Sequence, residues 1–129
     1  MEERLAWTPK RVKVVSSMKR TKNSGQLSGF CPRYHQAVEL IGRRWSGAII
    51  RSLLSGDRRF SAIAELVPGV SDRLLTARLR ELEDAGIVHR EVDPGPPIRV
   101  AYSLTHAGSE LEVTIRALGE WAHRWIPVR

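Results

Sequence analysis

The chain has 129 residues, 42% of them hydrophobic, which is enough for one compact domain with additions. No apolar run approaches the about 20 residues that a membrane-spanning helix needs, and Lys13 interrupts the valines near the start, so no secretory leader is expected. A single cysteine excludes an internal disulfide framework. These features predict a cytoplasmic protein that does not contact membranes.

The net charge of +7 is concentrated at the start of the chain. Residues 1–30 carry seven Lys or Arg and two Glu, whereas residues 31–129 carry fourteen Arg and twelve acidic residues. We interpret residues 1–30 as a basic N-terminal arm and residues 31–129 as one domain. Two readings of the arm remain open: a mobile segment that adds non-specific attraction to phosphates, or a solvated terminus.

A helical support is predicted next. Apolar residues recur at intervals of i, i+4, i+7 and i+11, and the pattern continues over residues 48–54 until Gly56-Asp57 ends it. Gly42 is expected to split this region into two helices. The residues at those first intervals are Tyr34, Val38, Ile41 and Trp45.

Residues 60–86 have the pattern of a helix-turn-helix. The first helix has apolar residues at i, i+3, i+4 and i+7 from Phe60, with Ser61 as a candidate cap, and the turn is Pro68-Gly69-Val70. The second helix is predicted from Ser71 to Ala85, with Ser71 as N-cap and Gly86 as its stop. Its leucines form an inward stripe at positions 75, 79 and 82.

The opposite face of this second helix is the predicted DNA-reading surface. Arg73 and Arg80 point most directly away from the leucines and could bond guanine, while Thr76 could place its methyl group against thymine. Ala77 lies on the same face. Arg78 lies only about 60° from the leucine stripe, which favours a structural ion pair or a phosphate contact over base reading.

After Gly86 the pattern alternates, as in a strand, on both sides of the proline-rich loop 93–97. This predicts a hairpin wing with Arg99 near its tip, where it could reach a phosphate or a minor groove. Arg58 and Arg59, just before the first motif helix, and Ser71 are further candidates for the DNA backbone. For each arginine the alternative is ordinary solvation. The fold class indicated by these elements is α+β, mostly α: a winged helix-turn-helix.

The last helix is predicted from about Thr105 to Arg124. Apolar residues spaced 4, 3, 4 and 3 keep one seam facing a partner helix, which indicates a homodimer. Packing of this seam on the chain's own body is the alternative. The predicted interface residues are Leu111, Ile115, Leu118, Trp121, Ala122 and Trp125.

Several runs of residues closely resemble the HxlR-type winged helix-turn-helix regulators, in order and at the family's spacing over residues 31 to about 125. The resemblance implies a MarR-like winged helix-turn-helix with terminal dimerisation helices, in a bacterial homodimeric transcription factor whose subunits join through those helices. Arg43-Arg44 departs from the usual Gly-Lys. The matching runs are Cys31-Pro32, Leu40 to Trp45, Arg59-Phe60-Ser61, Pro68 to Ser71, Leu75 to Glu83 and Pro96 to Thr105.

Met18-Lys19-Arg20-Thr21 looks like the usual start of such a regulator. Residues 1–17 are therefore interpreted either as a genuine basic arm or as an upstream extension from a misplaced start codon. Related regulators use a cysteine at the place of Cys31 to respond to oxidants, quinones or aldehydes, and Pro32 favours a helix start there. Cys31 is thus a candidate thiol sensor, with an ordinary thiol as the alternative.

No residue pattern predicts catalysis, a cofactor or a metal site, because the four histidines are scattered without ligand spacing. The function expected is a DNA-binding transcriptional regulator, a repressor that binds an inverted-repeat operator as a homodimer at the nucleoid. Two rivals remain. One is a small-molecule sensor with an aromatic pocket at the dimer interface, formed by Trp45, Trp121 and Trp125. The other is a winged-helix adaptor for proteins.

Overall fold

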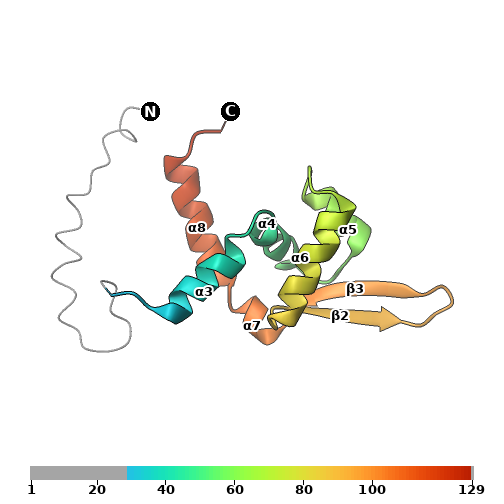
Figure 1. Cartoon of the computed structure of the whole chain (residues 1–129). Coiled ribbons are helices and arrows are strands. Elements are labelled where there is room, and N and C mark those ends of the chain that lie inside the picture. The colour runs from blue at the N-terminus through green and yellow to red at the C-terminus, as the bar shows by residue number, and fades with distance from the viewer. Residues whose placement is uncertain (1–28, 129) are drawn as a thin grey trace.

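The computed structural model describes residues 29–128 (Figure 1). The predicted arm therefore lies almost wholly outside the described residues, as do both interpretations of residues 1–17. Within the described part, no helix has the length and apolar character needed to cross a bilayer. The elements in chain order are α3 Pro32–Ile41, α4 Ser46–Leu53, β1 Arg58–Arg59, α5 Phe60–Leu66, α6 Asp72–Asp84, β2 Val88–Asp93, β3 Arg99–Leu104, α7 His106–Ser109 and α8 Glu112–Trp125.

The predicted winged helix-turn-helix of α+β class is confirmed. Helices α5 and α6 form the motif, and β2 and β3 pair as an antiparallel hairpin from Val88–Leu104 to Asp93–Arg99. The two-residue strand β1 pairs with β3 on its other side, so the sheet order is β1-β3-β2. Figure 1 shows the hairpin extending beyond the helices on one side, with α3 and α8 at the other end of the molecule.

A single apolar core joins the motif to its support. The leucine stripe of α6 packs against α4 and α5, and each of its three leucines is at most 1% exposed. This burial removes their side chains from water, which stabilises the fold by about 1.5–3 kcal/mol for each fully buried leucine. The buried apolar residues are Ile49, Ile50, Leu53, Ile63, Val67, Leu75, Leu79, Leu82, Val88 and Ile115.

The support region follows the sequence prediction only in part. Gly42 caps α3 and separates it from α4, as expected. Of the four residues with helical spacing, Ile41 and Trp45 pack against the core, whereas Tyr34 and Val38 are 71% and 47% exposed. The apolar side of α3 is thus only half covered by its own chain.

Trp45 holds the helix-turn-helix turn against the support. Its backbone is left-handed, with φ of 80°, which is an uncommon conformation for a bulky residue. Its indole lies against Gly69 in the turn, where an added Cβ would come within 3.1 Å of the ring atom Cη2. Gly69 itself has φ of 101°, so both the conformation and the close approach require a glycine.

The prediction of one terminal helix was wrong. The segment divides into α7, capped by the Thr105 hydroxyl, and α8, which begins after Leu111. The Leu111 N–H bonds back only three residues, to the Gly108 carbonyl at 3.1 Å, so the chain tightens there before α8 starts. The predicted capping of the first motif helix by Ser61 was also wrong, because Arg59 occupies the N-cap of α5.

Candidate nucleic-acid interface

Helix α6 is positioned by its two ends and by its buried side. The Ser71 hydroxyl accepts the Leu74 N–H at 3.1 Å, and Asp72 adds negative charge to the first turn. At the other end Gly86 follows the helix with φ of 79°. The predicted boundaries and caps are confirmed, and the buried leucines fix which side of α6 faces outward.

The four residues predicted to contact bases are all exposed on α6: Arg73, Thr76, Ala77 and Arg80. The Thr76 hydroxyl donates to the Asp72 carbonyl at 2.8 Å, which occupies its hydrogen and orients the side chain. In residues 29–128 neither Arg73 nor Arg80 has a hydrogen bond or an ion pair. Both guanidinium groups therefore remain available for an external acceptor.

The structure adds a residue that the sequence pattern did not indicate. Thr76 and Arg80 of α6 line a small groove of about 330 Å³ together with Glu83 of the same helix and, from the hairpin, Arg90 and Tyr102. Arg90 and Tyr102 face each other across β2 and β3. The alternation of residues 87–92 located the strand, but only the packing of the hairpin beside α6 places Arg90 next to Arg80.

Arg78 has a structural role. Its side chain is only 11% exposed, its Nε donates to the Arg44 carbonyl at 2.9 Å, and its Nη1 lies 3.2 Å from the Glu81 carboxylate. Arg43 contacts the same carboxylate at 3.3 Å. The structural ion pair that its helical position favoured is thus present, and it ties α6 to the loop between α3 and α4.

The remaining candidates for the DNA backbone divide into two groups. Arg58 is directed inward, where its Nε donates to the Ser52 carbonyl and its Nη2 to the Ser55 hydroxyl, both at 2.7 Å. Arg59 and Arg99 are exposed, at the start of the motif and at the base of the wing loop. Phosphate binding by these arginines and by Ser71 stays a prediction.

Cys31 lies at a helix start, as predicted. It is the N-cap of α3, Pro32 occupies the first turn, and the Tyr34 N–H donates to the sulfur at 3.4 Å. The ring of His35 packs against Phe30 with 5.4 Å between their centroids. The thiol is half-buried and forms no disulfide in this chain.

The predicted interface residues of the last helix do not share one environment. Ile115 is 7% exposed and belongs to the chain's own core, and Leu111 packs against it. Leu118 and Trp121 are 57% and 53% exposed on the outer side of α8, and Ala122 and Trp125 are half-buried. The alternative of internal packing is therefore correct for Leu111 and Ile115.

The three tryptophans lie on two different elements of the described chain. Trp45 lies against Gly69, and the Arg44 guanidinium carbon lies 5.2 Å from the centroid of the Trp45 ring. Trp121 and Trp125 are on α8. Neither cavity described for residues 29–128 is lined by a tryptophan. In the same part of the chain no three His, Cys, Asp or Glu residues cluster as metal ligands.

A capped helix with arginines on its exposed side, packed beside a hairpin wing, defines a winged-helix DNA-binding protein. The chain belongs to the HxlR-like helix-turn-helix family, which it matches over residues 40–129. This family assignment confirms the resemblance seen in the sequence, and the chain is accordingly a transcriptional regulator.

Two relatives come from Bacillus subtilis strain 168. The HTH-type transcriptional regulator YvaP is 42% identical over 99 residues, which cover 77% of this chain and 92% of YvaP. The regulator YodB is 40% identical over 95 residues, covering 74% and 85% of the two chains. The reduced form of YodB has a TM-score of 0.69, with 39% identity and coverage of 76% of this chain and 96% of YodB.

The redox regulator HypR in its oxidised form is similar in structure, with a TM-score of 0.71 and 38% identity. The match covers 76% of this chain and 100% of HypR. YodB has also been crystallised after diamide treatment and with bound quinone.

Proposed function

We propose that this chain represses transcription in the cytoplasm by binding an inverted-repeat operator at the nucleoid as a homodimer. The observation that supports the proposal is that α6 has two different sides. Three leucines are buried on one side, and two arginines without partners in the described chain are exposed on the other. Such a face matches the major groove, in which arginine can bond guanine through two hydrogen atoms.

The contacts to DNA divide into base reading and backbone binding. Arg73, Thr76, Ala77 and Arg80 face the bases, and Thr76 keeps its methyl group for thymine because its hydroxyl is bonded internally. Arg90 supports this surface from the wing, beside Arg80.

Backbone contacts come from the margins of this face. Arg59 of β1 and Arg99 of the neighbouring strand β3 bind phosphates, and Ser71 marks the start of α6, where N–H groups favour an anion. Arg58 and Arg78 contribute mainly by holding the motif together, since their guanidinium groups are already bonded within the chain.

Exposed apolar surface supports the homodimer. Leu118 and Trp121 on α8, and Tyr34 and Val38 on α3, are exposed. Figure 1 shows both helices at the end of the molecule away from the wing. Large apolar side chains left exposed on a small domain favour an interaction site, and two-fold pairing of the same surface is the commonest way to cover them. The seam is thus built from the outer side of α8 and from α3, without Ile115.

A thiol response is a second function that one observation favours. The Cys31 sulfur accepts a backbone N–H at the start of α3, and the similar proteins include a redox regulator and a quinone-bound YodB. Because α3 also carries part of the proposed dimer surface, a change at Cys31 would act on the spacing of the two recognition helices. With one cysteine per chain, a disulfide would join two subunits or a subunit and a small thiol.

Selection of DNA fragments from a genomic library tests the main function. The purified chain should select an inverted repeat with half-site centres about 34–36 Å apart, and two chains should bind each site. Selection of single, unrepeated sites with one chain bound would contradict the proposal.

Diamide and a quinone test the thiol response on the selected site. Each should change the affinity of the wild-type chain and leave Cys31→Ser unaffected. An unchanged wild-type binding curve would make Cys31 an ordinary thiol.

A further inference from the structure

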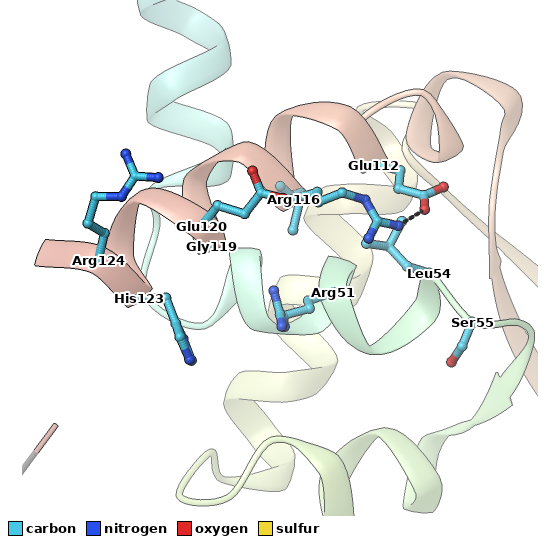
Figure 2. A pocket seen from close by; sticks show the side chains of 10 residues that line it. Arg51, Leu54, Ser55, Glu112, Arg116, Gly119, Glu120, His123 and Arg124 are labelled. Atoms are coloured by element: carbon cyan, nitrogen blue, oxygen red, sulfur yellow. Dashed lines mark hydrogen bonds and ion pairs between the residues drawn. The ribbon is translucent and has the colours of Figure 1, made fainter. Parts of the chain in front are cut away.

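A charged groove lies beside the contact between α4 and α8. It lies between α4 and α8, has a volume of about 980 Å³, and is open to solvent (Figure 2). One wall of the groove is formed by Arg51 of α4 and by Leu54 and Ser55, which follow that helix. The other wall includes Ile115, Arg116 and His123 of α8. Its size lies within the range of small-molecule sites, about 300–1,000 Å³.

Arg51 fits into this groove because Gly119, the residue opposite it, has no side chain. Its Nη1 lies over Gly119, where an added Cβ would be 3.2 Å away. Within residues 29–128 Arg51 has no hydrogen bond or ion pair, whereas Arg116 is paired with Glu112 on the same helix. Figure 2 shows Glu120 pointing away from Arg51, and His123 extending on the same side as Arg51.

The net positive charge of the side chains that line the groove favours an anionic ligand. Three arginines line the groove with two glutamates, so these charged side chains leave one positive charge in surplus. A single carboxylate balances this surplus and can accept two hydrogen bonds from one guanidinium. The neighbouring wall of Leu54 and Ile115 is half-buried to buried, and it offers apolar contact to the body of such a ligand.

We propose that this groove binds a small organic monocarboxylate, with Arg51 as the primary contact of its carboxylate. Because the groove lies between α4 and α8, a ligand bound in it would also regulate the protein. Ile115 and Gly119 line the groove against α4, whereas Leu118 and Trp121 of the same helix are exposed and do not line it. A ligand wedged between α4 and α8 would therefore shift the DNA-binding core relative to the dimer seam, an effect that rests on the proposed function above.

Calorimetry with the full chain and benzoate as probe tests the site, with benzamide as its neutral counterpart. Benzoate should bind saturably, and benzamide should bind about tenfold or more weakly because it lacks the charge-assisted bonds. Arg51→Gln should weaken benzoate binding by about tenfold or more, and Gly119→Leu should abolish it by displacing Arg51 and filling the groove. Arg33→Gln, an exposed arginine on α3, is the matched control and should bind as the wild type does.

Two results would overturn the site. One is the absence of saturable benzoate binding to the wild type, and the other is equal binding by Arg51→Gln and wild type with both chains folded by circular dichroism. DNA affinity is then compared with and without benzoate, and a change that Arg51→Gln lacks is expected. Saturable binding without any change in DNA affinity would overturn the regulatory role. Since ligand binding is measured without DNA, its failure leaves the proposed repressor function intact.

Discussion

The two faces of α8 predict opposite consequences for two substitutions on the same helix. Ile115 is 7% exposed and packs in the core, whereas Leu118 is 57% exposed on the outer side. Ile115→Ala should lower the free energy of unfolding by about 2–5 kcal/mol, because it leaves a cavity in a packed interior. Leu118→Asp should leave the fold of the subunit intact and weaken the dimer.

The size of the effect on association follows from the exposed fraction of Leu118. Full burial of leucine contributes about 1.5–3 kcal/mol, so covering the exposed 57% contributes about 0.9–1.7 kcal/mol in each subunit. In a two-fold dimer the substitution removes both copies, which amounts to about 1.7–3.4 kcal/mol, or roughly 20- to 300-fold in the dissociation constant. The aspartate weakens the dimer further because its charge would be desolvated in the seam.

Sedimentation over a concentration series measures the association, and urea unfolding at fixed protein concentration measures the stability. Leu66→Asp is the matched control, since Leu66 is 51% exposed on α5, away from the seam, and should sediment as the wild type does. A Leu118→Asp chain that dimerises with wild-type affinity would refute the proposed seam. Dissociation of Ile115→Ala without loss of stability would refute the assignment of the two faces.

Further substitutions test the DNA face and its support. Arg73→Ala or Arg80→Ala should reduce the binding free energy for the selected operator by about 1–3 kcal/mol, and that for random DNA by much less. Arg99→Ala should weaken binding to the two DNAs equally. Equal losses on both DNAs for all three variants would contradict the assignment of base contacts. Ser71→Ala should lower the free energy of unfolding by about 1 kcal/mol, since it removes the N-cap of α6, and an unchanged urea midpoint would refute this. Removal of residues 1–17 should reduce the log–log salt slope of DNA binding by up to about 0.9 for each phosphate that the segment neutralises, and an unchanged slope would exclude the segment from the DNA interface.

The helix-turn-helix was predictable because its signals are local. The cap at Ser71, the stop at Gly86 and the leucine spacing each act within a few residues, and together they determined both the limits of α6 and its outward side. The division of the support at Gly42 was predictable for the same reason.

The roles of individual arginines depended on contacts between distant segments. Arg58 bonds to Ser52 and Ser55, and Arg78 bonds to the Arg44 carbonyl, 34 positions away in the chain. No periodicity encodes such partners. Arg90 became a candidate for the DNA face only when the packing of the hairpin beside α6 was known.

The terminal helix shows why apolar spacing alone could not assign the dimer seam. Intervals of three and four residues describe an apolar band on a helix, whether that band faces the chain's own core or a partner. In α8 the band is wide enough for both: Ile115 is covered by the core, and Leu118 and Trp121 remain exposed. A helix that contacts the DNA-binding core on one side and a second subunit on the other can transmit a shift between them. The groove at Arg51 adjoins the first of these sides, so an organic acid bound there could alter the distance between the two recognition helices without touching DNA.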